Sequence, residues 1–141
     1  MKLTGKTGAV ILLVLAAFAF LAWQAEMKRR MYIQAAVITE ALGVMNVAKM
    51  QVVTARDNLG KWPSSNEESG LPPASDYAIG AISQLRVSNG GVVTVTFNGK
   101  SGVKDGTICL TPHTGMDVRW KCTTPSFEGI EQWAPQCTYQ K

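Results

Sequence analysis

The sequence predicts an α+β protein. A long N-terminal helix, whose first half spans a membrane, is expected to pack on a four-stranded antiparallel sheet. Three observations predict this fold: an uncharged apolar run at residues 7–25, a helical apolar periodicity through residues 33–59, and β-branched segments separated by turn residues from residue 82 on. A helix and a sheet that each have one apolar face bury these faces against one another in two layers.

The apolar run at residues 7–25 predicts a membrane-spanning segment. As a helix it would be roughly 28 Å long, against about 30 Å for the hydrocarbon core of a bilayer. The run follows Lys2 and Lys6 and ends at Glu26. The alternative is a secretory signal cleaved at residues 17–19 (Ala-Phe-Ala). Because that cut would leave apolar residues on the mature chain, we favour a retained anchor.

The flanking charges and the cysteines favour opposite orientations of this anchor. Lys28, Arg29 and Arg30 after the run outnumber Lys2 and Lys6 before it, so the positive-inside rule places the following residues in the cytoplasm. The chain also has three cysteines without a C-x-x-C pair, which disfavours zinc and thioredoxin chemistry and favours a disulfide in an oxidising compartment. We give the cysteines more weight.

The helix is predicted to continue beyond the anchor as far as Gly60. Apolar residues recur every three or four positions along one face: Ile33, Val37, Ala41, Val44, Ala48, Val52, Ala55 and Leu59. No proline precedes Pro63, and Gly60 is a typical residue just past a helix end. We therefore expect a leader and transmembrane segment at 1–25, an amphipathic continuation at 26–60 and a globular head at 61–141.

A loop and four strands follow the helix. Residues 61–77 are rich in Ser, Pro, Gly and Asn and form the loop, which Trp62 is expected to attach to the core. The strands are predicted at residues 82–87, 92–97, 107–111 and 117–122. Asn89-Gly90 and Asn98-Gly99 are turn signals between strands, and residues 112–115 (Pro-His-Thr-Gly) are expected to join the last two strands.

The charge distribution argues against nucleic acid as a partner. The chain carries a net charge of +4, but from residue 59 on the charges balance. The basic residues there are Lys61, Arg86, Lys100, Lys104, Arg119, Lys121 and Lys141, and the acidic ones are Glu67, Glu68, Asp76, Asp105, Asp117, Glu128 and Glu131. Nucleic-acid binding would need a basic cluster in the head. We expect the basic residues 28–30 to meet lipid headgroups instead.

No catalytic or metal-binding constellation is predicted. His113 is the only histidine, in a turn-like stretch, and is expected to be a solvated loop residue. Without a second histidine or a cysteine pair, no metal site of usual composition can be drawn. Gly90-Gly91 has no phosphate-loop context. We expect no enzymatic activity, no cofactor and no metal.

Among the cysteines, Cys122 and Cys137 are the favoured disulfide pair. The bridge would tie the last predicted strand to the C-terminal segment. Closing a loop of about 15 residues is worth on the order of 3 kcal/mol. Cys109 remains, with Ile108 and Leu110 expected on the opposite side of the sheet from it, and we expect a buried, inert thiol.

The order of parts and several short motifs resemble those of type IV pilins, in particular the type IVa group. Members often carry a Ser-Glu-Ala segment followed further along the helix by Gly-Lys-Trp-Pro; here residues 39–41 (Thr-Glu-Ala) precede residues 60–63 (Gly-Lys-Trp-Pro). Residues 88–92 (Ser-Asn-Gly-Gly-Val) are similar to the family's first hairpin. Residues 118–122 (Val-Arg-Trp-Lys-Cys) match its last strand, and 134–137 (Ala-Pro-Gln-Cys) match its closing Pro-x-Cys.

The resemblance implies a structural protein of the bacterial inner membrane with its head in the periplasm, or of the surface pilus after assembly. Its partners would be other pilin subunits, contacted through the N-terminal helix, the pilus assembly machinery and the membrane. Such pili serve cell adhesion and twitching motility. The alternatives are a membrane-tethered accessory protein that binds or modulates the pilus machinery without polymerising, and a DNA-uptake pilin.

The N-terminus departs from the family pattern, which favours an atypical or minor subunit. Without gaps, the resemblance places a leader-peptidase site at Gly5, with Lys6 as the first mature residue where the family has Phe; the alternative is an ordinary uncleaved anchor. The family's glutamate then corresponds to Val10, and a cut after Gly8 would place Leu13 there. That glutamate is thought to pair with the terminal amine of a neighbouring subunit, because a buried charge needs a partner.

Overall fold

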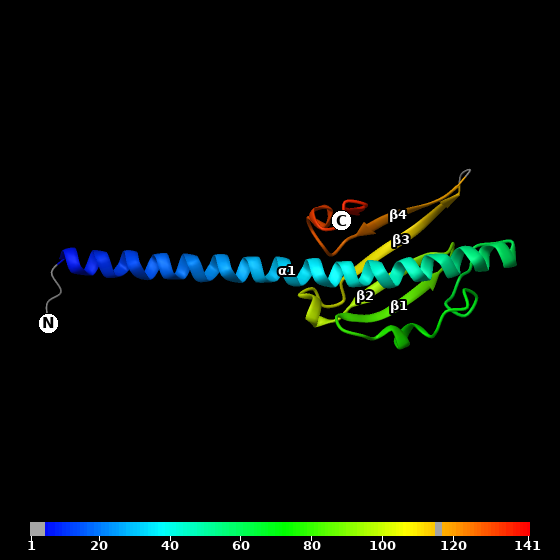
Figure 1. Ribbon diagram of the computed structural model, residues 1–141, viewed down its shortest axis with the longest axis horizontal. Coiled ribbons are helices and arrows are strands. Elements are labelled where there is room, and N and C mark those ends of the chain that lie inside the picture. Colours follow the sequence, from blue (N-terminus) through cyan, green and yellow to red (C-terminus); the bar gives the residue numbers. More distant parts are fainter. Residues whose placement is uncertain (1–4, 115–116) are drawn as a thin grey trace. The chain divides into compact units, whose positions relative to one another are not determined.

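A computed structural model of the chain describes residues 5–114 and 117–141, with side chains described from Thr7 on (Figure 1). The elements in chain order are α1 (Gly5–Leu59), the 3₁₀ turn η1 (Ala74–Tyr77), β1 (Ile82–Ser88), β2 (Val92–Phe97), η2 (Gly99–Ser101), β3 (Thr107–Thr114), β4 (Val118–Thr124), η3 (Ile130–Gln132) and β5 (Cys137–Tyr139). The chain divides into two compact units, Met1–Ile33 and Gln34–Lys141. We call them the N-terminal segment and the head.

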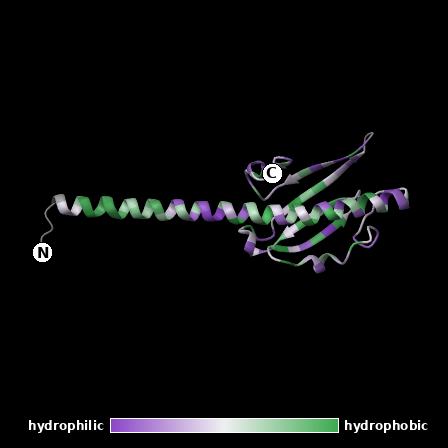
Figure 2. Cartoon of the chain, in the orientation of Figure 1, coloured by the Kyte–Doolittle hydropathy of each residue, from purple (hydrophilic) through white to green (hydrophobic). Residues whose placement is uncertain are grey.

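The N-terminal segment is helical from Gly5 on. Its apolar side chains are largely exposed: Leu12, Leu13 and Phe18 are 69%, 71% and 68% exposed, and the rings of Phe20 and Trp23 lie near one another, with centroids 6.1 Å apart. In Figure 2 the apolar stretch is followed by a hydrophilic one at the basic residues 28–30. By length and composition, this helix is able to cross a membrane.

The part of α1 within the head buries one face. Five of the predicted positions are buried: Val37, Ala41, Ala48, Val52 and Ala55. Ile38 and Met45 are fully buried as well, whereas Val44 is half-buried at the rim and Leu59 is 46% exposed. An apolar stripe of this width covers more than one row of side chains. Its centre therefore lies slightly further round the helix than the periodicity predicts.

The sheet has five strands in the order β1-β2-β3-β4-β5. The first four are antiparallel, as predicted, and β2 alternates as its β-branched sequence predicts, with Val93, Val95 and Phe97 buried. The prediction of four strands is wrong by one, because β5 pairs with β4 in parallel. A strand of only three residues is too short to produce an alternating pattern.

The predicted turn at residues 112–115 also differs from the structure. Pro112, His113 and Thr114 belong to β3 and pair with β4, and Gly115 lies outside the described residues. Proline is tolerated here because β3 extends past its last pair with β2, Leu110 with Val93. Its missing N–H therefore costs no hydrogen bond to β2.

The core of the head lies between α1 and the sheet face that the helix covers (Figure 1). Leu85, Val95 and Ile108 on three neighbouring strands are fully buried there. Phe97 packs edge-to-face on Phe127 from the C-terminal loop, with ring centroids 5.1 Å apart. The C-terminal loop is thus part of the core.

Candidate functional site

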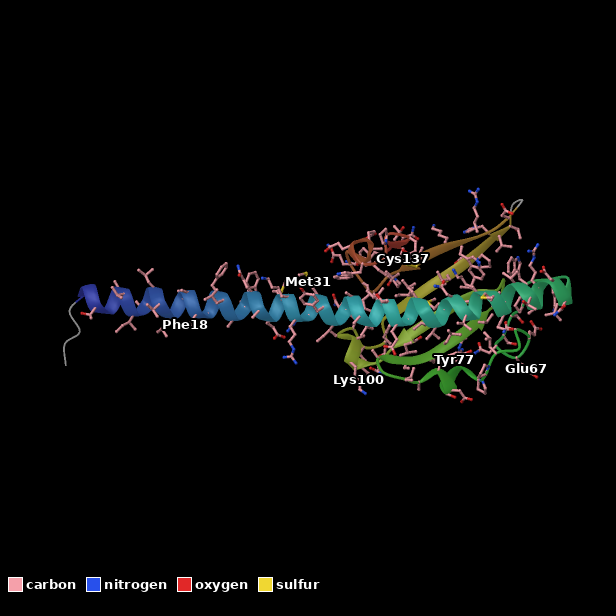
Figure 3. All side chains as sticks on the ribbon, in the orientation of Figure 1. Phe18, Met31, Glu67, Tyr77, Lys100 and Cys137 are labelled. Carbon is pink, nitrogen blue, oxygen red and sulfur yellow. A yellow bond between two sulfur atoms is a disulfide. The ribbon has the colours of Figure 1, made fainter. Side chains whose placement is uncertain are left out.

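The apolar surface of the N-terminal segment is the first candidate for contact with other molecules. Its exposed side chains are Val10, Ile11, Leu12, Leu13, Val14, Leu15, Phe18, Phe20, Leu21 and Trp23. Phe18 projects away from the helix (Figure 3). Full burial of one such side chain is worth about 1.5–3 kcal/mol. A surface of this kind is stable only against lipid or against other apolar helices.

This surface carries no charge. Val10 and Leu13, the two positions where the pilin resemblance would place a glutamate, are 58% and 71% exposed. Among the described residues the first carboxylate along the helix is Glu26, whose Oε1 lies 3.4 Å from Arg30 Nε in an exposed pair. Gly5 and Lys6, the predicted leader-peptidase site, lie at the start of α1, and their side chains are outside the described part of the chain.

The free edge of β1 is closed by Asn66. The Asn66 side-chain amide donates to Leu85 O and Pro72 O, both at 2.9 Å, and its Oδ1 accepts from Val87 N at 2.6 Å. The bonds to Leu85 and Val87 are those that a residue of an added strand would make. Asn66 is only 8% exposed. It therefore holds the loop against β1 and occupies the positions that a foreign strand would need.

Two of the sequence motifs meet at Gly91. The Gly91 N–H donates to Pro63 O at 2.9 Å, and Gly91 has φ +72°. A Cβ there would lie 2.7 Å from Trp62 Cε3 and 3.1 Å from Val52 Cγ1. Only glycine lets the hairpin turn and the Trp-Pro segment approach so closely. Trp62 attaches the loop to the core, as expected.

A third motif joins this contact through Trp120. The ring of Trp120 lies edge-on to Trp62, with centroids 6.3 Å apart. Arg56 lies over Trp62 at 4.9 Å and Lys49 over Trp120 at 5.9 Å, both from α1. Such cation–π contacts are each worth about 0.5–1 kcal/mol at exposed sites. Three of the motifs that carry the resemblance, at residues 60–63, 88–92 and 118–122, thus form one contact beside the second half of α1.

The opposite edge of the sheet is closed by a disulfide and a carboxylate. Cys122 and Cys137, the favoured pair, are directly paired on β4 and β5 and form a disulfide, with Cα atoms 4.4 Å apart. Glu131 Oε1 accepts from Tyr139 N at 2.9 Å. This bond lowers the pKa of the Glu131 carboxyl, because it stabilises the ionised form. Asn66 and Glu131 thus each bond to the backbone of one outer strand, while β5 pairs only with residues 122–124 of β4.

The C-terminal loop is also held by Thr124, which is fully buried. Its hydroxyl donates to Thr107 O at 2.6 Å and accepts from the N–H groups of Ser126 and Phe127. The sequence does not single out Thr124, Asn66 and Glu131, because a single polar residue at a strand end, in a loop or in a short turn gives no periodic signal.

A groove lies between the loop after α1 and β1. It has a volume of about 880 Å³, and its polar wall includes Ser65, Arg86 and Asn89. Glu68 beside it accepts from the backbone and the hydroxyl of Ser64, at 2.7 and 2.9 Å, and these bonds lower the Glu68 pKa. Neighbouring Glu67 is exposed on the same loop (Figure 3).

The remaining candidate residues lie on the outer side of the sheet. Cys109 is half-buried, with its sulfur 3.6 Å from Thr94 Oγ1, so the expectation of a buried thiol is wrong. Its side chain points away from the core, as the burial of Ile108 and Leu110 requires. His113 is exposed on β3. In residues 5–114 and 117–141, no group of three or more His, Cys, Asp or Glu could hold a metal ion.

Comparison with known proteins gives a family for this arrangement. A family model described as pilin (bacterial filament) matches residues 36–138. No curated protein matches the chain. The match covers the head helix, all five strands down to Thr138 and both half-cystines, which are the elements that carry the type IV pilin resemblance. The chain therefore belongs to the pilin family and is a pilin-like structural subunit.

Proposed function

We propose that this chain is a minor, atypical subunit of a type IV pilus. It is anchored in the bacterial inner membrane with its head in the periplasm, and it associates with other pilins through residues 7–25 on its way to the surface. The observation that carries the proposal is the uncharged, exposed surface of that segment. In the head, by contrast, Asn66 and Glu131 bond to backbone groups of the outer strands β1 and β5. The disulfide supports an oxidising location for the head.

We place the leader-peptidase cut at Gly5, which makes Lys6 the first mature residue. Val10 then stands where the family's carboxylate would meet a neighbour's terminal amine, so this subunit lacks that charge pair. A subunit without it is expected to enter filaments less often than one that has it, which is the reason for proposing a minor role. No cofactor and no catalytic activity are part of the proposal.

The experiment that tests the proposal is detection of the chain in filaments sheared from cells, compared with the membrane pellet of the same cells. We expect a small fraction in the filaments, and an intact mass that matches a chain beginning at Lys6. Absence from filaments that contain the other pilins of the cell would overturn the assembly proposal. An uncut chain in filaments would overturn the proposed processing alone.

A substitution at Val10 tests the missing carboxylate. Val10→Glu should increase the fraction in filaments, since it restores the charge that pairs with the amine of a neighbouring subunit. Leu13→Glu, three positions along the same helix, is the matched control and should reduce incorporation, because its carboxylate would lack that partner. Equal effects of the two variants would show that position 10 has no special role.

The second candidate function is a tethered accessory protein that contacts the pilus machinery without polymerising. The absence of any carboxylate from residues 7–25 favours it. It predicts that the chain remains in the membrane pellet and that Val10→Glu leaves its distribution unchanged. The fractionation experiment therefore separates the two functions directly.

A further inference from the structure

We infer that the outer face of the sheet binds an acidic polysaccharide. This outer sheet face is the side that α1 does not cover. Its residues are Gln84, Arg86 and Ser88 of β1, Val92, Thr94 and Thr96 of β2, Thr107, Cys109, Thr111 and His113 of β3, Arg119, Lys121 and Thr123 of β4, and Thr138 of β5. The alternate residues of the same strands face the core.

The charge on this face has one sign. None of the five strands contains Asp or Glu, while Arg86, Arg119 and Lys121 are exposed on it. Within the part of the chain that the structure describes, none of these three forms an ion pair. The carboxylates of the head therefore lie outside the strands, on α1, in the 3₁₀ turns and in loops; Asp117 before β4 is the nearest in sequence, and Glu67 lines the groove beside Arg86. An anionic partner is favoured here.

Hydroxyl groups fill the space between the cations. The face carries Ser88, Thr94, Thr96, Thr107, Thr111, Thr123 and Thr138. Thr111 pairs across the strands with Lys121, and Thr123 lies two residues further along β4. Among the described residues, the Thr111 and Thr123 hydroxyls have no hydrogen-bond partner and are free for a ligand. The face has no Phe, Tyr or Trp, so it offers nothing on which a nucleobase would stack.

The density of the cations distinguishes between anionic polymers. Arg86 on β1 and Lys121 on β4 are three strand spacings apart, roughly 14 Å, whereas Arg119 and Lys121 are neighbours on the same face of β4. A DNA duplex carries one negative charge per about 1.7 Å of its axis, which is more charge than these few cations neutralise. A carboxylated polysaccharide carries at most one carboxylate per sugar ring, and each ring also carries hydroxyl groups. A ligand of this composition suits a face on which threonine hydroxyls outnumber the cations.

Binding of fluorescein-labelled oligogalacturonate to the full-length chain in detergent micelles tests this inference. The head variant is R86Q/R119Q/K121Q, and the matched control replaces the three basic residues at 28–30 with glutamine. We expect the head variant to weaken binding at least about tenfold, as loss of charge-assisted hydrogen bonds requires, and the control to change it less than about twofold. Absent binding, or equal losses in the two variants, would overturn the inference.

The hydroxyl groups are tested by T111V/T123V, which keeps the side-chain shape and all charges. We expect this variant to weaken oligogalacturonate binding several-fold and to leave binding of a 20-base-pair DNA duplex unchanged. The inference would be overturned if the duplex bound more tightly than the oligosaccharide and T111V/T123V affected neither. That result would show that the face binds anions through its charge alone. Far-ultraviolet circular dichroism checks that each variant is folded. The measurement uses unassembled protein, so its outcome is independent of pilus assembly.

Discussion

The N-terminal segment and the head differ in how far the groups that could bind another chain are already occupied. In the head, Asn66 of the loop bonds to backbone groups of β1, and Glu131 bonds to the backbone of β5. In the N-terminal segment the apolar side chains are exposed. An open sheet edge is a template for indiscriminate pairing. We infer that association of this chain is directed mainly to the helix, because at the sheet edges only the first part of β4 extends beyond its pairs with β5.

Two identical truncations, one in each region, should have very different effects. Leu85→Ala removes a fully buried side chain and should lower the free energy of unfolding of the head by about 2–5 kcal/mol. Leu12→Ala, at a position 69% exposed, should change it by less than about 0.5 kcal/mol. Denaturation of the full chain in detergent, followed by tryptophan fluorescence, measures both. Similar losses would mean that the two regions do not differ as described.

Loss of the disulfide should affect the head alone. Cys122→Ala combined with Cys137→Ala removes a constraint on the unfolded chain worth about 3 kcal/mol. Cys109→Ala, at a half-buried thiol on the outer sheet face, is the control and should cost less than about 1 kcal/mol. The same denaturation measurement applies. A double variant as stable as the control would show that β5 is held by other contacts.

Opening the β1 edge should change both stability and association. Asn66→Ala leaves Leu85 O and Val87 N without partners and should cost about 1–3 kcal/mol. It should also produce concentration-dependent dimers through the exposed edge, visible by light scattering of the detergent-solubilised chain. Asn58→Ala, at an exposed position of α1, should do neither. A destabilised but strictly monomeric variant would show that Asn66 holds the loop without protecting the edge.

The smallest expected effect is a pH dependence at the β5 edge. Because the Glu131 pKa in the folded chain lies below its ordinary value of 4.5, its contribution to stability is present above that pH. The contribution is lost as the pH falls through the lowered pKa. Thermal unfolding of the wild type and of Glu131→Gln should therefore differ most above pH 4.5 and converge in more acidic solution. A difference for Glu131→Gln that stays constant across this pH range would contradict the assignment.

The sequence predicts those elements whose core-facing residues recur at regular intervals. The three- and four-residue spacing along α1 and the alternation of Val and Thr in β2 are visible because each core-facing residue recurs with the period of its own element. The resemblance to type IV pilins predicted the family as well. Its motifs contain residues that meet in the fold, such as Gly91 and Trp62, and no local sequence pattern predicts that contact.

The features that the sequence did not predict depend on contacts between distant segments. β5 becomes a strand because Cys137 is paired and bridged to Cys122 on β4. Pro112 continues β3 because β2 has already ended beside it. Asn66 closes an edge formed by residues 85 and 87, far along the chain. The sequence of a single segment does not show which distant residues it will contact, so the periodicity of that segment could not predict these features.

Site-specific photo-crosslinking in cells tests most directly whether association is directed to the helix. A photoreactive phenylalanine analogue would be placed at Leu12 on the exposed helix surface, and separately at Ser88 on β1 and Thr138 on β5. The account predicts crosslinks to other pilin subunits from position 12 and no strand-paired dimers from positions 88 and 138. Strand-paired dimers crosslinked from position 88 or 138, together with no crosslinks from position 12, would contradict it.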